Sequence, residues 1–166
     1  MNNPKIRFTI KGLGKMEAEL YPEKAPKTVE NFLKLCNEGF FEGLIFHRVI
    51  QGFMIQGGGF DTSMKQKPAK PIVGEFKANG FAQNDLHHDR GVLSMARTND
   101  PNSASSQFFV MHAEAGYLDG QYAAFGELTS GFDVLDAIAN TRTHSVGWYD
   151  DVPKEAIVIE KVEVIA

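Results

Sequence analysis

The chain has 166 residues, of which 43% are hydrophobic and 23% charged, so it is long enough to bury a substantial core in one domain. A formal net charge of −4 and a pI near 5.7 argue against a nucleic-acid-binding protein, and no apolar run is long enough to cross a bilayer. The N-terminus lacks the apolar core of a signal peptide and the single cysteine, Cys36, cannot form an internal disulfide, so we expect a cytoplasmic protein.

The hydrophobic pattern predicts about eight short strands and two helices. In chain order these are strands at residues 6–10 and 15–20, a helix at 28–38, two strands within 46–60, strands at 91–96, 106–111 and 121–128, a helix at 132–140 and a strand at 157–165. Residues 61–84, 97–103 and 141–153 are predicted loops, and the first is long enough to edge a binding site. The many antiparallel turns favour a closed or nearly closed barrel, although the pattern alone leaves a β-sandwich open.

Both predicted helices are amphipathic and have candidate caps. Thr28 is a candidate N-cap of the first helix, and Gly39 is placed to end it. Thr129 or Ser130 is a candidate N-cap of the second helix. Cys36 belongs to the apolar face of the first helix, so we expect a packed side chain rather than a nucleophile.

The most informative stretch is FHRVIQGFMIQGGGF, residues 46–60, which places an arginine among apolar residues. On a strand, Arg48 shares a face with Phe46 and Ile50. Such an arginine either covers the core with its aliphatic stem or presents a fixed cation beside a hydrophobic pocket. The sequence of this strand alone leaves both interpretations open.

The second half of the stretch adds polar and soft apolar groups. Gly52 indicates a tight turn, after which Met54 and Gln56 are two residues apart and share a face. Phe53 lies at the turn, where alternation cannot assign its side. The three glycines at residues 57–59 permit positive φ or a close backbone approach, but no Lys-Ser or Lys-Thr pair follows, which disfavours a phosphate loop.

A similar mixture of polar and apolar groups occurs in the predicted strand at residues 106–111. Alternation places Gln107 and Phe109 on one face and Phe108 and Val110 on the other. An amide beside an aromatic ring suits a pocket, whereas core packing remains the alternative for Phe109, because a strand can be buried on both faces.

The sequence His87-His88-Asp89 raises the question of a metal site. Adjacent histidines point to opposite sides of an extended chain, and no further ligands follow at the spacing of a metal site. We therefore expect a solvated loop here. A metal-dependent hydrolase that uses His47, His87 and His88 lacks ligand spacing in the same way.

Three segments in order resemble the cyclophilins, a family of peptidyl-prolyl cis-trans isomerases. They are FHRVIQGFMIQGGGF, GVLSMARTNDPNSASSQFFV and YLDGQYAAFGEL, and the likeness extends over nearly the whole chain. The resemblance implies a closed eight-stranded antiparallel barrel capped by a helix at each end. It also implies an isomerase, without metal or cofactor, that accelerates rotation about X-Pro bonds in protein substrates and so assists folding.

The resemblance assigns roles to individual residues. It implies catalytic roles for Arg48, Gln56 and Phe53. The substrate-binding residues that it implies are Met54, Ala96, Arg97, Thr98, Gln107, Phe109, Tyr117, Leu118 and Tyr122, with the backbone of residues 96–98 pairing with substrate. The expected partners are proline-containing peptides and unfolded protein clients, with no nucleic acid or membrane, and we expect a monomer.

Three departures from the pattern of many eukaryotic members resemble bacterial cytoplasmic cyclophilins. Tyr117 replaces a tryptophan that helps to bind cyclosporin, so we expect weak cyclosporin binding. Tyr122 replaces a histidine at the rim of the pocket, and the loop after Ala96 is one residue longer than in the short eukaryotic form.

Isomerisation breaks no bond and needs no nucleophile or general base. The barrier of about 18–20 kcal/mol comes from amide resonance, so a donor to the twisted prolyl amide lowers it. Arg48, as a permanently charged donor, is the predicted source of this hydrogen bond. The alternative function is a non-catalytic module that only binds proline-containing segments, for which an arginine at this position is unnecessary.

Overall fold

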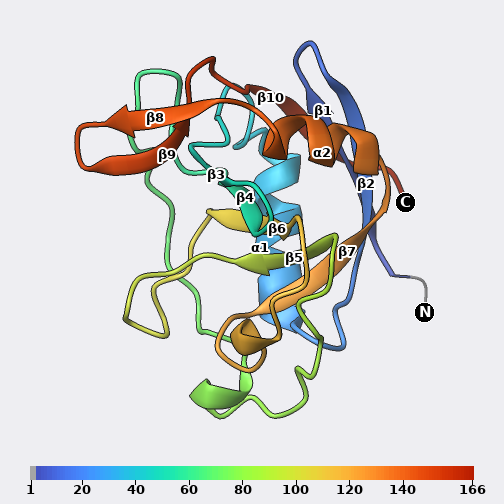
Figure 1. The fold of residues 1–166 in the computed structure, drawn as a ribbon. Coiled ribbons are helices and arrows are strands. Elements are labelled where there is room, and N and C mark those ends of the chain that lie inside the picture. Colours follow the sequence, from blue (N-terminus) through green and yellow to red (C-terminus); the bar gives the residue numbers. More distant parts are fainter. Residues whose placement is uncertain (1–2) are drawn as a thin grey trace.

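The computed structural model describes residues 3–166, which contain ten strands and two α-helices (Figure 1). The strands are β1 (Lys5–Ile10), β2 (Gly14–Leu20), β3 (Arg48–Ile50), β4 (Met54–Gly57), β5 (Val92–Met95), β6 (Phe108–Met111), β7 (Ala124–Ser130), β8 (Thr143–Val146), β9 (Tyr149–Pro153) and β10 (Ile159–Val164). The helices are α1 (Pro26–Asn37) and α2 (Phe132–Ala139), with 3₁₀ turns η1 (Lys77–Asn79) and η2 (Gly116–Leu118). None of these helices is long and apolar enough to span a membrane.

Eight strands form one antiparallel sheet in the order β10-β1-β2-β7-β5-β6-β4-β3. The prediction of a closed barrel is wrong, because the sheet is an open half-barrel that curls through 224° and has β10 and β3 as its edges. Strand β3 is three residues long, and the chain before it reaches the β10 edge through scattered hydrogen bonds and an isolated bridge, from Ile45 to Val158 just before β10. A continuous hydrogen-bonded ladder therefore does not join the two edges.

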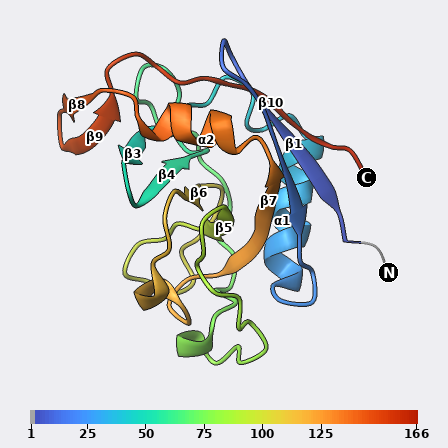
Figure 2. The ribbon, with the colours of Figure 1, turned by 45° about the vertical axis from the view of Figure 1, so that its right-hand side comes forward.

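The inner face of the sheet carries the main hydrophobic core. The two predicted strands at residues 6–10 and 15–20 are confirmed as β1 and β2; their alternate residues are buried, and Phe8 pairs across the strands with Met16. The ring of Phe32 from α1 lies 5.5 Å from that of Phe108 and 5.1 Å from that of Phe125. Helix α1 therefore fills the inside of the curved sheet, while α2 lies across one end of it, against β2, β3 and β4 (Figure 2).

The N-terminus of α1 is stabilised differently from the prediction. Ala25 is the N-cap and Pro26 occupies the first turn, where its missing N–H costs nothing. Thr28 does not cap the helix; its backbone N–H and its hydroxyl each donate to the buried carboxylate of Glu75, at 2.7 Å. Gly39 follows the C-cap with φ +68, so its predicted role in ending the helix is confirmed.

Two further expectations about helices have clear outcomes. The residue that precedes α2 is Gly131, so neither Thr129 nor Ser130 is its N-cap. Cys36 is 7% exposed and packs in the main core, as predicted, and burial raises the pKa of its thiol to about 12.

Residues 141–153, predicted to be a loop, form the β8–β9 hairpin. Most of its side chains are exposed on both faces, so no alternation of apolar and polar residues marks it in the sequence. Strand β9 packs beside β3, and the hairpin projects past the edge of the main sheet (Figure 1). This position brings the hairpin close to the stretch that contains Arg48.

Candidate active site

A second, smaller hydrophobic cluster lies on the outer side of β4, β5 and β6. Alternation separates the two clusters: Ile55, Phe108 and Val110 belong to the main core, whereas Met54 and Phe109 belong to the second cluster. The predicted division of β6 into two faces is therefore confirmed. The second cluster forms the floor of a surface cavity.

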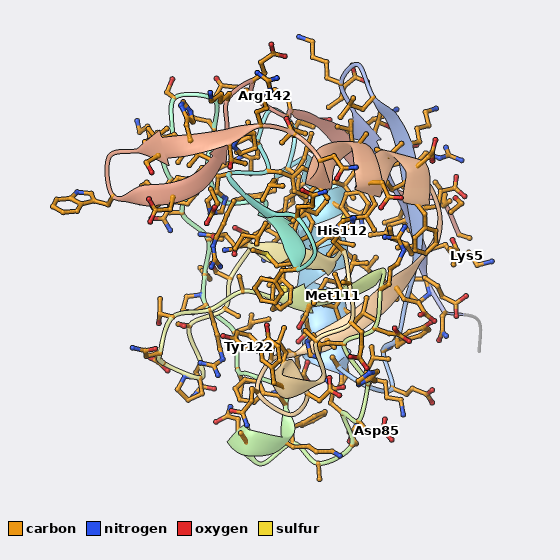
Figure 3. All side chains as sticks on the ribbon, in the orientation of Figure 1. Lys5, Asp85, Met111, His112, Tyr122 and Arg142 are labelled. Carbon is orange, nitrogen blue, oxygen red and sulfur yellow. The ribbon has the colours of Figure 1, made fainter. Side chains whose placement is uncertain are left out.

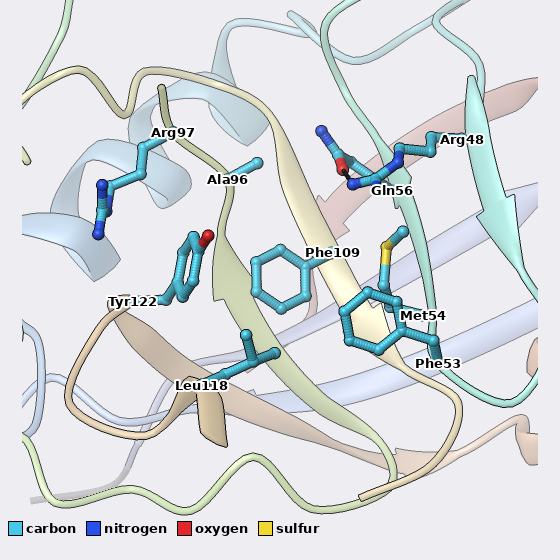
Figure 4. Close-up of a pocket in the computed structure, with 9 residues that line it drawn as sticks. All are labelled: Arg48, Phe53, Met54, Gln56, Ala96, Arg97, Phe109, Leu118 and Tyr122. Carbon is cyan, nitrogen blue, oxygen red and sulfur yellow. Dashed lines mark hydrogen bonds between the residues drawn. The ribbon is translucent and has the colours of Figure 1, made fainter. Parts of the chain in front are cut away.

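The cavity has a volume of about 120 Å³ and combines apolar and polar side chains (Figure 4). It is lined by Arg48, Phe53, Met54, Gln56, Ala96, Arg97, Phe109, Leu118 and Tyr122. All nine are among the site residues that the sequence predicts. They come from β3, β4 and the turn between them, from β6 and η2, and from the segments that follow β5 and precede β7.

Arg48 lies at the edge of this cavity with its charge unpaired among residues 3–166. It faces Gln56 across the β3–β4 pair, and its Nη1 donates to Gln56 Oε1 at 3.3 Å. Gln56 Nε2 in turn donates to Gln107 Oε1 at 3.0 Å. In the part of the chain that the structure describes, no carboxylate lies within 4.0 Å of the guanidinium, so the amide chain orients a cation that remains available to a ligand.

The predicted common face of Phe46, Arg48 and Ile50 is confirmed for Arg48 and Ile50 and wrong for Phe46. Phe46 precedes β3 and is fully buried in the main core, together with Val49. Ile50 packs against the second cluster instead. Arg48 therefore does not cover the core with its stem; it is exposed and borders the cavity.

Phe109 forms the centre of the apolar floor, between two rings. It stacks on His88 with centroids 6.0 Å apart, and the ring of Tyr122 meets it edge-on at 5.7 Å. It lines the cavity although it is only 4% exposed, so it is both a packed residue and a pocket residue. The two interpretations left open by the sequence both apply.

Arg97 is held in a fixed position at the opposite wall. Its guanidinium lies over the rings of Phe76 and Tyr122, 4.8 Å from each centroid. It also donates to the carbonyl oxygens of Gln121 (2.8 Å) and Thr98 (2.9 Å). This cation is therefore a structural fixture of the wall, in contrast to Arg48.

The triple glycine allows the backbone to approach Gln107. A Cβ at Gly59 would lie 2.3 Å from Cγ of Gln107, a distance that no side chain could adopt. The sequence predicted a close approach in this segment, and the structure places it directly behind the amide that supports Gln56.

Three predicted site residues do not line the cavity. Gln107 lies behind Gln56, as described above. Tyr117 is 73% exposed and stacks on Phe53 at 6.2 Å, so it extends the rim. Thr98 lies in the exposed loop after β5, where its N–H donates to Ser103 Oγ at 2.9 Å.

The histidine pair forms a support that sequence reasoning missed. His88 is fully buried rather than solvated, and its Nδ1 lies 2.8 Å from Asp119 Oδ1 while its Nε2 lies 2.9 Å from Ser94 Oγ. His87 contacts the other oxygen of Asp119, so the two histidines converge on one carboxylate instead of pointing apart. Residues 3–166 contain no group of three or more His, Cys, Asp or Glu side chains arranged to hold a metal ion.

Burial and hydrogen bonding fix the charges of this support. Burial lowers the pKa of His88, so its ring is neutral where it stacks on Phe109. Burial acts to raise the pKa of Asp119, but hydrogen bonds from His87 and His88 outweigh it and lower the pKa. The sequence gave no signal that His88 supports Phe109. The two histidines meet Asp119 only because η2, which Asp119 follows, folds back over their loop.

Comparison with known proteins identifies the family. The family described as cyclophilin type peptidyl-prolyl cis-trans isomerase matches residues 5–164. The chain belongs to the cyclophilin family. Membership makes it an isomerase, the first of the two functions that the sequence left open.

Individual relatives are similar to this chain in sequence and length, and a solved structure is similar to it in fold. Peptidyl-prolyl cis-trans isomerase A of Dickeya dadantii is 46% identical over 157 residues, which cover 92% of this chain and 80% of that protein. Peptidyl-prolyl cis-trans isomerase B of Escherichia coli is 46% identical over 160 residues, 91% of this chain and 94% of that protein. A crystal structure of a Cryptosporidium parvum cyclophilin type isomerase in the presence of the dipeptide Ala-Pro gives a TM-score of 0.83 at 30% identity, covering 98% of this chain and 99% of that one.

Proposed function

We propose that the cavity of about 120 Å³, here called the prolyl pocket, binds the proline of an X-Pro segment and that Arg48 catalyses its isomerisation. The observation that carries this proposal is an unpaired guanidinium, oriented by Gln56, at the edge of an apolar floor. Phe53, Met54, Phe109 and Leu118 contact the ring. The apolar surroundings exclude water, which otherwise solvates the planar resonance form.

Arg48 acts on the twisted amide. As the C–N bond rotates, the prolyl nitrogen becomes pyramidal and its lone pair can accept a hydrogen bond from the guanidinium, which also reaches the prolyl carbonyl. A charge-assisted hydrogen bond contributes about 1.5–3 kcal/mol. At about 1.4 kcal/mol for each factor of ten, this corresponds to roughly ten- to a hundredfold in rate.

The rest of the pocket holds the substrate backbone on either side of the rotating bond. Gln56, held in place by Gln107, anchors the rotating carbonyl. The N–H groups of Ala96 and Thr98 already donate to Gln107 O and Ser103 Oγ, which leaves Arg97 as the residue of this segment whose N–H can pair with a peptide. The N–H of Arg97, free among residues 3–166, supports a short stretch of antiparallel pairing between residues 96–98 and the backbone of the client.

The same proposal extends to partners and location. The clients are proline-containing segments of unfolded proteins, and residues 1–166 act as one monomeric isomerase domain in the cytoplasm. Tyr117 stands at the exposed rim in place of the tryptophan that helps many eukaryotic members to bind cyclosporin, which supports weak binding of cyclosporin. The Cryptosporidium cyclophilin structure with Ala-Pro supports the choice of a prolyl ligand.

The test is the exchange rate between cis and trans isomers of an unmodified Ala-Pro peptide, measured by NMR exchange spectroscopy. We expect Arg48→Ala to lower kcat/KM by about ten- to a hundredfold while the circular dichroism spectrum stays that of the wild type. Arg48→Lys should recover only part of the loss, because an ammonium lacks the planar fork of donors.

Arg142→Ala is the matched control, because Arg142 is an exposed arginine between α2 and β8, at the outer edge of the molecule (Figure 3). We expect it to retain full activity. Near-wild-type turnover by Arg48→Ala would refute the catalytic role of Arg48.

A further inference from the structure

A second cavity, of about 280 Å³, adjoins the prolyl pocket at Arg48. It is lined by His47, Arg48, Trp148, Tyr149, Asp150 and Asp151. Four of these residues belong to the β8–β9 hairpin, which projects beside β3 (Figures 1 and 2). We call it the hairpin cavity. Among residues 3–166, Arg48 alone lines both it and the prolyl pocket.

The hairpin cavity combines two aromatic rings with two carboxylates. Trp148 is 97% exposed, which is unusual for the largest apolar side chain. Tyr149 is anchored, with its ring edge-on to Phe60 at 5.2 Å. Within residues 3–166, neither Asp150 nor Asp151 forms an ion pair, and Asp150 accepts a single hydrogen bond, from Ser145. Exposed rings beside unpaired carboxylates are the surroundings that a cationic side chain prefers.

The inner wall of the hairpin cavity is an unpartnered histidine. His47 is 5% exposed, its ring lies 4.5 Å from that of Phe60, and its Nδ1 has no hydrogen-bond partner among the described residues. Burial and the neighbouring charge of Arg48 lower the pKa of His47 to about 4, so the ring is neutral at pH 7 and does not repel a cation.

Arg48 is itself a cation in the wall of the hairpin cavity, but two features limit its repulsion of a bound cationic side chain. Its Nη1 is committed to Gln56, which lies in the prolyl pocket. The two carboxylates on the hairpin outnumber its single charge. The local balance of formal charge in the hairpin cavity is therefore negative.

We propose that the hairpin cavity binds an arginine or lysine side chain of the client, located one or two residues after its proline. This inference rests on the proposed function and adds a sequence preference to it. Figure 4 shows Arg48 on one side of the prolyl pocket and Ala96 and Arg97 on the other. A proline whose carbonyl lies at Arg48 has its following residue directed toward the hairpin, and its preceding residues lie along the opposite wall.

The experiment measures cis–trans exchange in capped hexapeptides that differ at one position. Arg, Gln or Glu is placed one or two residues after the proline, and a second series places the same residues before it. We expect kcat/KM of the Arg peptide to exceed that of the Gln peptide by about fivefold when the variable residue follows the proline, and the Glu peptide to be the slowest. The advantage should shrink as salt is raised from 0.05 to about 0.5 M, because both carboxylates are accessible to solvent.

The variants assign the preference to the hairpin. Asp150→Asn with Asp151→Asn should bring the ratio of Arg to Gln turnover close to one, and Asn tolerates the φ of +61 found at Asp151. The control, Glu30→Gln with Glu160→Gln, removes two exposed carboxylates elsewhere and should keep the fivefold ratio. Trp148→Ala, at a fully exposed turn, reports on the aromatic contribution if the double variant fails to fold.

Several results would overturn the inference. Equal rates for Arg and Gln peptides in the wild type would exclude a basic subsite. An equal gain when Arg precedes the proline would show general attraction by the net charge of −4. Equal losses for both peptides in the Asp150/Asp151 variant would mean that the carboxylates act through Arg48. In each case the proposed isomerase function stands, provided that the wild type turns over the Gln peptide and that Arg48→Ala does so at least about tenfold more slowly.

Discussion

Phe108 and Phe109 are adjacent residues of one strand with the same side chain and different surroundings. Phe108 is fully buried, and its ring contacts those of Phe8, Phe32 and Phe41. Phe109 faces the prolyl pocket. A single strand therefore contributes one ring to the core and the next ring to the site.

This difference predicts opposite effects of the same substitution. Phe108→Ala should lower the free energy of unfolding by about 3–5 kcal/mol, because it leaves a cavity inside a ring of aromatic side chains. Phe109→Ala should lower kcat/KM at least about tenfold and destabilise the fold less, because its site already opens to solvent. Denaturant unfolding and peptide exchange on both variants check this, and unchanged kcat/KM for Phe109→Ala would contradict its place in the pocket.

Alternation predicted the site well at this scale, wherever a regular strand exists. It placed Gln107 and Phe109 correctly, as well as Met54 and Gln56. It failed for Phe46, because β3 begins only at Arg48 and the residues before it are irregular. Periodicity carries information about side-chain direction only inside an element, and the boundary of β3 is not visible in the sequence.

Helix α1 depends on a residue from a distant loop. The carboxylate of Glu75 accepts hydrogen bonds from the backbone N–H groups of Lys27 and Thr28, at 3.2 and 2.7 Å, as well as from the Thr28 hydroxyl. A negative charge at this end also interacts favourably with the helix dipole. Glu75 thus replaces the local cap that the sequence predicted, and it joins the long loop to the helix.

We expect Glu75→Ala to lower the free energy of unfolding by about 2 kcal/mol, because it leaves buried N–H groups of α1 without an acceptor. Glu30→Ala removes an exposed carboxylate from the same helix and should change the stability by less than about 0.5 kcal/mol. Urea unfolding of the two variants provides the comparison. Equal stabilities would show that the Glu75 cap contributes nothing.

Elements without a buried face were the hardest to predict. The β8–β9 hairpin has a positive-φ glycine at its turn, Gly147, but few buried side chains, so its strands lack the alternation that identified β1 and β2. Its stability comes from packing of β9 beside β3, which is a tertiary contact. The same reason hid the hairpin cavity, since the four lining residues that come from the hairpin had no apparent role in the sequence.

The curvature of the whole sheet was also beyond sequence patterns. The number of strands in the main sheet agrees with the prediction. Closure of a barrel, however, depends on whether the two edge strands, here β10 and β3, pair with each other, and the turn residues do not determine this. Here the gap is crossed by a few hydrogen bonds, including those from Gly43 to Ile159 (2.9 Å) and from Ile159 to Leu44 (2.7 Å). An irregular segment therefore joins the two edges of the half-barrel in place of a ladder.

The stability of the whole molecule should vary with pH through His87. Hydrogen bonds to Asp119 and Glu114 raise the pKa of His87 from 6.5 to about 8. The stabilisation is fully present below pH 6.5, where the unfolded histidine is also protonated, and it is lost as the pH rises through 8.

We therefore expect the difference in Tm between the wild type and His87→Gln to be largest below pH 6.5 and to shrink by pH 9. His144→Gln, at an exposed histidine of the hairpin, is the control for the loss of a histidine. Thermal unfolding followed at intervals of half a pH unit measures the profile. A difference that stayed constant from pH 6 to pH 9 would contradict the predicted titration.

The burial of Cys36 has a practical consequence. It is the only cysteine of the sequence, and at neutral pH almost none of its sulfur is in the thiolate form that reacts with maleimides or oxidants. A cysteine introduced at an exposed position of β8 such as His144 would then be the sole reactive site without any change to the native thiol. Fluorophores could thus be attached to the hairpin for titration with labelled peptides, on a protein that is otherwise unaltered.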